Sequence, residues 1–158
     1  MFSLQIFVFV SFLTGNLLGF VKQPDTKPPT INEPIPTKTG NDQKVESIII
    51  QSLNELLTAV HSRNYERIKN LLHVDFQYKG CDSIENRETY TRVFALMPKE
   101  MSLSFKLIPI GAGNTTASSI VFKAVFTAKI GKKESTALVQ MTLDKKLLVF
   151  TGGQTLDC

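Results

Sequence analysis

Two cysteines and two histidines are the first side chains to consider for nucleophilic or metal chemistry in this chain of 158 residues. Cys81 could act as a nucleophile if His61 or His73 lay beside it as a base. The same side chains could bind a metal ion, but their spacing, with Cys158 at the far end of the chain, matches no zinc pattern. The sequence also lacks the Gly-x-Ser-x-Gly motif of serine hydrolases.

The N-terminus decides how these cysteines are interpreted. Residues 1–21 carry no charged side chain and contain an apolar block, which is typical of a secretory signal peptide. We expect cleavage near Gly15 or Gly19, so that residues 1–19 are removed and the mature protein is secreted to the extracellular space. The alternative is an uncleaved anchor, because residues 2–21 are just long enough to span a bilayer. A membrane is a partner of this chain only in that case.

In an oxidising compartment, an even number of cysteines is paired by default. We therefore predict a disulfide between Cys81 and Cys158, in preference to a catalytic thiol at Cys81. This bridge would close a long loop and stabilise the domain by roughly 4 kcal/mol. Oxidised cysteines leave no thiolate ligands, and the sequence predicts neither a metal nor a cofactor.

Two further features fit a secreted protein. Asn114-Thr115-Thr116 is an N-glycosylation sequon, which predicts a glycan on Asn114. Residues 20–41 hold all but two of the prolines and few apolar residues, which indicates an extended linker between the signal peptide and a folded domain.

The composition indicates one folded domain. Hydrophobic residues make up 42% of the chain and 20% are charged, so the chain can bury a sizeable core. The net charge is +4, to which the pairs Lys132-Lys133 and Lys145-Lys146 contribute. These pairs fall in successive predicted turns at opposite ends of a sheet and form no basic stripe. We therefore expect no nucleic acid partner.

Hydrophobic spacing predicts helices in the first half of the domain and strands in the second. A helix is expected from Asn41 or Asp42 to Ser62, because apolar residues recur there every three or four positions. The other expected elements are a short helix capped by Asn64, a strand over residues 75–80, a helix over residues 87–97, and strands near residues 103–107, 120–130, 137–143 and 147–151.

Short turns between the last four strands predict an antiparallel meander, whose long middle strands must bend, usually at bulges. The helices would then pack on one face of a curved antiparallel sheet, which is an α+β fold. On the opposite face, Val121, Val125 and Leu138 would form an apolar patch, which predicts a homodimer through the sheet. The inward face is expected to carry Phe122, Ala124, Phe126, Ala128, Val139 and Met141.

Residues 71–81, Leu-Leu-His-Val-Asp-Phe-Gln-Tyr-Lys-Gly-Cys, lead from the short helix into the first strand through an Asp-Phe-x-Tyr step. With the order of elements, this segment makes residues 42–158 resemble the NTF2-like family, a cone-shaped fold that includes the ketosteroid isomerases. The Tyr-Lys-Gly-Cys segment, the signal peptide and the cysteine near the end are also similar to secreted, uncharacterised NTF2-like proteins of nematodes. The resemblance implies a short second strand, for which residues 81–86 leave little or no room.

The resemblance also implies where catalytic residues would lie. Isomerases of the family use an aspartate on or just after the first strand, and the matching position here is near Tyr78 or Lys79. Asp82 comes two or more positions later, and a dehydratase-type member would need a histidine such as His73 in the pocket. We therefore assign no catalytic residue and keep Tyr78, Asp82 and His73 as candidates.

A pocket inside the cone would suit a small apolar ligand, unless its side chains simply fill the core. Its predicted lining is Phe76, Tyr78, Tyr90, Phe94, Phe105, Phe122 and Phe126. Two functions follow. The first is a secreted, non-catalytic binding module that takes a small apolar ligand in the cone or a protein partner on the sheet. The alternative is an isomerase- or dehydratase-type enzyme that uses the cone pocket.

Overall fold

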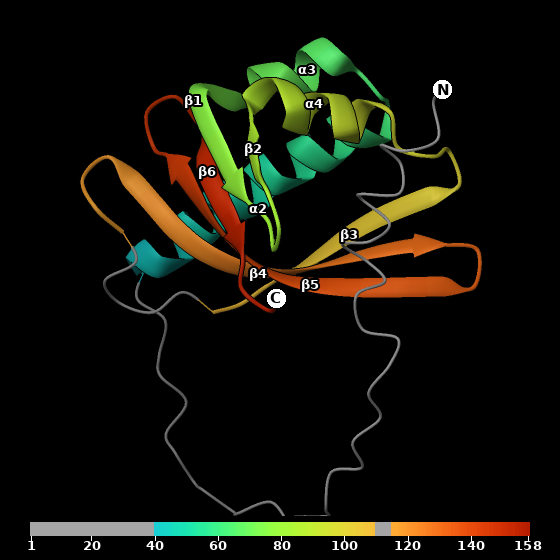
Figure 1. Cartoon of the computed structure of the whole chain (residues 1–158). Helices are drawn as coiled ribbons and strands as arrows, with labels where there is room; N and C mark the ends of the chain where they lie inside the picture. Colours follow the sequence, from blue (N-terminus) through green and yellow to red (C-terminus); the bar gives the residue numbers. More distant parts are fainter. Residues whose placement is uncertain (1–39, 110–114) are drawn as a thin grey trace, which may run out of the picture.

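The computed structural model describes residues 40–109 and 115–158. The predicted signal peptide, residues 20–39 of the predicted linker and Asn114 of the sequon lie outside the described residues. Within these ranges, the helices lie on one side of a curved sheet (Figure 1). The predicted α+β class is therefore confirmed. The elements are α2 (Gly40–His61), α3 (Tyr65–Asn70), β1 (Leu72–Lys79), β2 (Ile84–Asn86), α4 (Arg87–Ala95), β3 (Met101–Leu107), β4 (Ser119–Ile130), β5 (Lys133–Asp144) and β6 (Phe150–Thr155).

The six strands are arranged in the order β2-β1-β6-β5-β4-β3. Strands β3 to β6 form the antiparallel meander that the short turns predict. Strand β1 pairs with β6 in parallel, however, so the sheet is mixed rather than antiparallel throughout. A parallel pair needs a long connection, and here the connection is most of the domain, from β2 to β5. Strand β2 has three residues, which makes it the very short second strand that the sequence leaves room for.

The helix ends follow local capping chemistry. The Asn64 side chain caps α3 by accepting a hydrogen bond from a backbone N–H of the first turn at 3.0 Å, as its position predicts. Asn86 caps α4 in the same way. Helix α4 ends at Ala95, two residues before the predicted end, because the residue that precedes Pro98 is disfavoured in a helical conformation.

The long middle strands have the expected length, but no bulge interrupts the pairing between them. Strands β4 and β5 have 12 residues each and pair without interruption. The irregularities lie where β6 meets its neighbours, between Thr142 and Leu143 on β5 and between Leu72 and Gln77 on β1. Both pairings of β6, with β5 and with β1, therefore contain a register shift, whereas the β4–β5 pairing contains none.

The last strand begins three residues later than the predicted range of 147–151. Residues 145–149 instead form a turn, because the Asp144 carboxylate accepts hydrogen bonds from the N–H groups of Lys146 and Leu147, both at 2.8 Å. The side chains of Leu147 and Leu148 are consequently exposed. These two backbone bonds also hold the pKa of Asp144 below its usual value, with His73 and Lys146 adding smaller effects in the same direction.

The inner face of the sheet is the one that the alternation predicts. Its side chains pack against one face of α2, on which Ile49, Leu53, Leu56 and Val60 are buried. None of the helices in the described ranges combines the length and apolar character needed to cross a membrane. The predicted inner-face residues are all buried except Phe126, which is half-buried: Phe122, Ala124, Ala128, Val139 and Met141.

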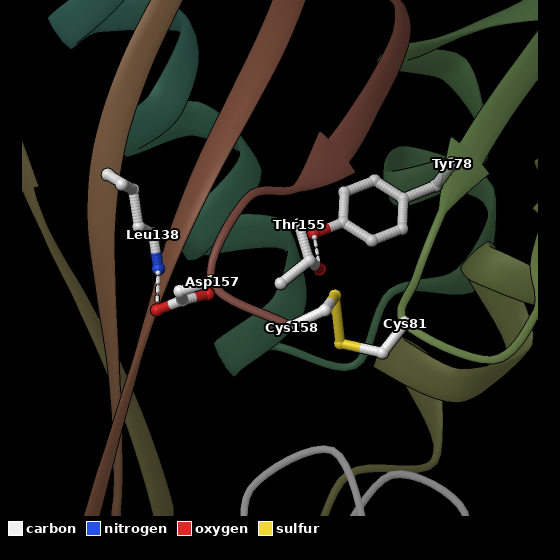
Figure 2. Close-up of a disulfide and its surroundings, with 6 residues drawn as sticks. All are labelled: Tyr78, Cys81, Leu138, Thr155, Asp157 and Cys158. Carbon is white, nitrogen blue, oxygen red and sulfur yellow. Dashed lines mark hydrogen bonds between the residues drawn. A yellow bond between two sulfur atoms is a disulfide. The ribbon is translucent and has the colours of Figure 1, made fainter.

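A disulfide joins Cys81 to Cys158 across 77 residues, as predicted (Figure 2). It connects the turn after β1 to the tail after β6. The tail also pairs with β5, because the Asp157 carboxylate accepts from the Leu138 N–H and the Leu156 N–H donates to the Leu138 carbonyl, both at 2.8 Å. The bridge therefore holds together chain ends that the sheet already places side by side.

Replacing Cys81 and Cys158 together by Ser should destabilise the domain by about 4 kcal/mol, because the unfolded chain regains the entropy of a 77-residue loop. Urea unfolding of the wild type and the double variant measures the difference. Wild-type protein unfolded in the presence of a reductant should match the double variant. Equal midpoints for the oxidised wild type and the variant would contradict the prediction.

Candidate functional site

Aromatic rings occupy one end of the space between the helices and the sheet. Tyr90 on α4 lies at the centre of this group. Its ring centroid is 4.9 Å from that of Phe76, 5.2 Å from that of Tyr78 and 4.6 Å from that of Phe94. Rings at these separations are in direct contact. Four of the seven residues predicted to line a pocket therefore pack against one another here.

The other predicted pocket residues lie further along the inner face. Phe105 on β3 and Phe126 on β4 occupy paired register positions, with ring centroids 6.3 Å apart, and both are half-buried. Phe122 is almost completely buried, and its ring lies 6.5 Å from that of Phe150. All seven predicted side chains are buried or half-buried, whereas Phe150, which is fully buried, was not among them.

The two interior phenols are held in their neutral form. Burial raises the pKa of Tyr90 well above its usual value, and the neighbouring Tyr78 adds to this effect. Burial also raises the pKa of Tyr78, against a hydrogen bond with Thr155 that lowers it. The two oxygens of that bond are 2.9 Å apart, and either hydroxyl can donate (Figure 2).

The three candidate catalytic residues do not converge. His73 lies at the start of β1, where its Nδ1 accepts a hydrogen bond from the Asp75 N–H at 3.2 Å. Tyr78 lies near the other end of the strand and faces the interior, and Asp82 lies beyond the strand with an exposed side chain. A base and an acid that share one substrate need to lie within hydrogen-bond reach of it. These three positions do not meet that condition together.

One carboxylate on the Tyr78 side of the sheet was missed by the sequence reasoning. Glu85 pairs with Tyr78 in the register of β1 and β2, is half-buried, and accepts a hydrogen bond from the Ser83 hydroxyl at 2.8 Å. Its position depends on the pairing of a three-residue strand, which no local pattern indicates. Among the residues that the structure describes, no group of three His, Cys, Asp or Glu side chains could hold a metal ion.

A groove of about 260 Å³ lies on the outer face of the sheet, opposite the helices. Its floor is formed where β6 has two successive glycines instead of side chains. A Cβ atom on Gly152 would lie 3.0 Å from the Gln77 carbonyl oxygen, and one on Gly153 would lie 3.0 Å from both the Gln140 carbonyl oxygen and the Tyr78 ring. The groove is lined by Gln140, Thr142, Thr151, Gly152, Gly153 and Gln154.

A bulge explains why Thr151 contributes to this groove. Phe150 pairs with Leu143 and Gly152 pairs with Thr142, so Thr151 is an extra residue on β6. Bulges redirect a side chain, and they occur frequently beside binding sites. The Thr151 hydroxyl donates to the Thr142 carbonyl at 3.4 Å, which joins the two strands at the rim of the groove.

The alternation that puts Val139 and Met141 on the inward face also puts Gln140 and Thr142 on the outward face, but no site was expected there. The available signal was the Gly152-Gly153 pair, because glycine inside a strand often marks a bulge or a close approach of backbone. The expected strand ended before these glycines, so the signal was lost. The neighbours of β6 also depend on its parallel pairing with β1.

Comparisons with known proteins agree with this architecture. A family model described as NTF2-like domain matches residues 46–158. An NTF-2 like protein of unknown function from Shewanella oneidensis is 13% identical, with a TM-score of 0.60, and the match covers 72% of this chain and 99% of that one. No curated protein matches the chain.

Two other solved structures show the range of proteins that share the fold. The association domain of C. elegans CaMKII is 10% identical, with a TM-score of 0.58, and 74% of this chain and 98% of that one are covered. An LEH-like epoxide hydrolase of M. tuberculosis is 14% identical, with a TM-score of 0.51, and 69% of this chain and 81% of that one are covered.

Replacing Gly153 by Ala should lower the free energy of unfolding by about 1–3 kcal/mol, because the added Cβ overlaps the Gln140 carbonyl oxygen and the Tyr78 ring. The matched control is Gly40→Ala, where a Cβ meets nothing within 4 Å. Chemical denaturation measures both variants. Equal stability of the two would show that the sheet accommodates a side chain at Gly153.

Replacing Tyr90 by Phe should raise the pH at which the protein unfolds in alkali. Burial keeps the Tyr90 phenol protonated in the folded state, whereas the unfolded phenol ionises near its usual pKa of about 10. The stability linked to Tyr90 is therefore complete below that pH and is lost as pH rises toward the higher pKa of the folded state. Circular dichroism across an alkaline titration measures the midpoint. Below about pH 9 every phenol is protonated, so the pH-dependent part of the difference in unfolding free energy between the two proteins should vanish there.

Proposed function

This chain belongs to the NTF2-like family, and from that premise we propose that it is a secreted, non-catalytic binding module that acts through the outer face of its sheet. The observation that carries this proposal is the groove at Gly152, a hollow lined by amide, hydroxyl and backbone groups on the face opposite the helices. Such a surface offers hydrogen bonds to a partner. It requires no acid or base for its action.

The state of the interior supports the outer face as the binding surface. The rings of Phe76, Tyr78 and Phe94 each contact the ring of Tyr90, so these side chains pack against one another in the interior. The Tyr78 hydroxyl, near the position where isomerases of the family hold their base, is engaged with Thr155. The small apolar ligand predicted for the cone is therefore less well supported than a partner on the sheet.

The compartment also belongs to this proposal. Both cysteines of the disulfide are exposed, and an exposed bridge persists where the surroundings are oxidising. This supports an extracellular location, together with the apolar N-terminal segment and the sequon. We expect residues 1–19 to be removed and residues 20–41 to act as a linker.

A second copy of this chain is the macromolecular partner that we propose for the outer face. Val125 and Leu138 are paired across β4 and β5, and Val121 lies further along the same face, each half-buried. This patch adjoins the groove, because Val121 pairs with the groove residue Thr142, and the exposed Lys123 lies on the same face between Val121 and Val125. A protein of similar fold, from C. elegans CaMKII, is named an association domain, which is consistent with a role in association.

Native mass spectrometry of protein secreted from eukaryotic cells tests the proposal. We expect a chain without residues 1–19, two hydrogens lighter than its reduced form, as a dimer or with added mass that is released on denaturation. Thr142→Phe fills the groove and should reduce ligand mass, and Val125→Lys should reduce the dimer. Gln51→Phe on the exposed side of α2 is the control that should change neither.

Two outcomes would decide against this function. A wild-type monomer that carries no added mass would contradict a binding module of this kind. An added mass that Thr142→Phe and Val125→Lys both retain would place the ligand inside the cone. That second result would favour the alternative, an isomerase- or dehydratase-type enzyme with Tyr78, Asp82 or His73 as its candidate residues.

A further inference from the structure

We propose that the groove at Gly152 binds a small hydroxylated anion, whose charged group lies between Lys79 and Lys123. This inference rests on the proposed function, because it assigns a chemical class of ligand to the same outer face. It adds two residues that do not line the groove but lie on either side of it. It also replaces the apolar ligand that the sequence predicts for the cone.

The strand registers place the two lysines in one line across the sheet. Lys123 on β4 pairs with Gln140 on β5, Gln140 pairs with Gln154 on β6, and Gln154 pairs with Lys79 on β1. Residues in directly paired positions share a face of the sheet. The order across four strands is therefore lysine, glutamine, glutamine, lysine, and both glutamines line the groove.

The separation of the lysines suits a shared ligand. Neighbouring strands lie about 4.8 Å apart, so the two Cα atoms are separated by about 14 Å over three intervals. Each lysine carries its ammonium group on a flexible four-carbon stem, so both groups can approach a ligand above the glutamines. Such a pair of point charges attracts an anion from two sides of the groove.

The charge around the groove favours an anion. Lys79 and Lys123 are exposed, and neither forms an ion pair with a carboxylate of the described residues. The carboxylate of Asp157, in the tail beside β5, is occupied by the Leu138 N–H. Glu134, at the far end of β5, lies opposite Lys129 in the register. The hydrogen bond orients the Asp157 carboxylate but leaves its negative charge, against which Lys79 and Lys123 together supply two positive charges.

The side chains that line the groove are suited to form hydrogen bonds with hydroxyl groups of the ligand. The side-chain amides of Gln140 and Gln154 are half-buried and make no hydrogen bond to other residues within the described ranges. An amide can both donate and accept, which matches the hydroxyl group of a ligand. Thr142 adds a hydroxyl at the same site. The volume of about 260 Å³ limits the ligand to a small molecule.

Titration of ¹⁵N-labelled protein by NMR tests this assignment, with three probes at low salt. D-glucuronate carries hydroxyls and a carboxylate, D-glucose carries hydroxyls alone, and inorganic sulfate carries charge alone. We expect glucuronate to shift the amide signals of Gln140, Gly152, Gly153 and Gln154 and to bind more tightly than either of the other probes. Binding should weaken with added salt, because exposed charges are screened.

The variants separate charge from shape. Lys79→Gln and Lys123→Gln should each weaken glucuronate binding by about two- to fivefold, the effect of losing one exposed charge pair, and should leave glucose binding unchanged. Lys132→Gln, an exposed lysine in the β4–β5 turn, is the matched control and should have no effect. Thr142→Phe should abolish the binding of all three probes. All four substitutions lie on the surface, and an otherwise unchanged spectrum shows that each variant is folded.

Several results would overturn the assignment. Equal weakening by Lys132→Gln would show non-specific attraction to a basic protein. Equal binding of glucose and glucuronate would remove the role of the lysines. If no probe shifts the groove signals while the secreted protein still carries a mass that Thr142→Phe removes, the ligand class is wrong and the proposed function stands. If that mass is also absent and the wild type is a monomer, both fail.

Discussion

The parallel pairing of β1 with β6 is the contact on which the rest of this structure depends. It joins the N-terminal helices, which lead into β1, to the meander, which ends in β6. Phe150 donates its backbone N–H to the Leu71 carbonyl at 2.8 Å where this pairing begins. The two glycines that follow permit the strands to approach closely, because a Cβ at Gly152 would meet the β1 backbone. The disulfide then connects the chain just beyond the other end of both strands.

The same pairing gives the two faces of the sheet different characters. On the inner face, Gly153 leaves room for the Tyr78 ring, which packs on Tyr90 and completes the aromatic end of the core. On the outer face, the missing side chain at Gly152 leaves a hollow between Thr142 and Gln154. One short glycine segment therefore helps to fill the interior and to shape the exterior. This links the packing of the core to the surface that we propose as a binding site.

The family supplies a scaffold rather than an activity. Relatives of this fold include an epoxide hydrolase and an association domain, at identities of 14% and 10%. Function in such a fold resides in the side chains that each sequence places on it. Here the outer face carries the half-buried amides of Gln140 and Gln154, which strand register places in one line with Lys79 and Lys123.

Much of the architecture could be predicted because its causes are local. Asn64 caps a helix through its own side chain, and the alternation from Ile120 to Ile130 decides which residues face inward. The disulfide followed from the number of cysteines and the expected compartment. The predicted end of the last helix and the predicted start of the last strand were wrong by a few residues. Pro98 ends the helix early, and the hydrogen bonds to the Asp144 carboxylate delay the strand.

The sequence by itself determined the helices and the long strands, which face of each is apolar and which cysteines pair, since these depend on residue type and spacing, but it did not indicate the three-residue strand β2. Only the tertiary structure decided which strands are neighbours. That choice places Glu85 beside Tyr78 and aligns Lys79 with Lys123, although 44 positions separate the two lysines in the chain. Strand order is set by how the whole inner face can be buried against the helices. No short segment carries that information, because burial is a property of the assembled domain.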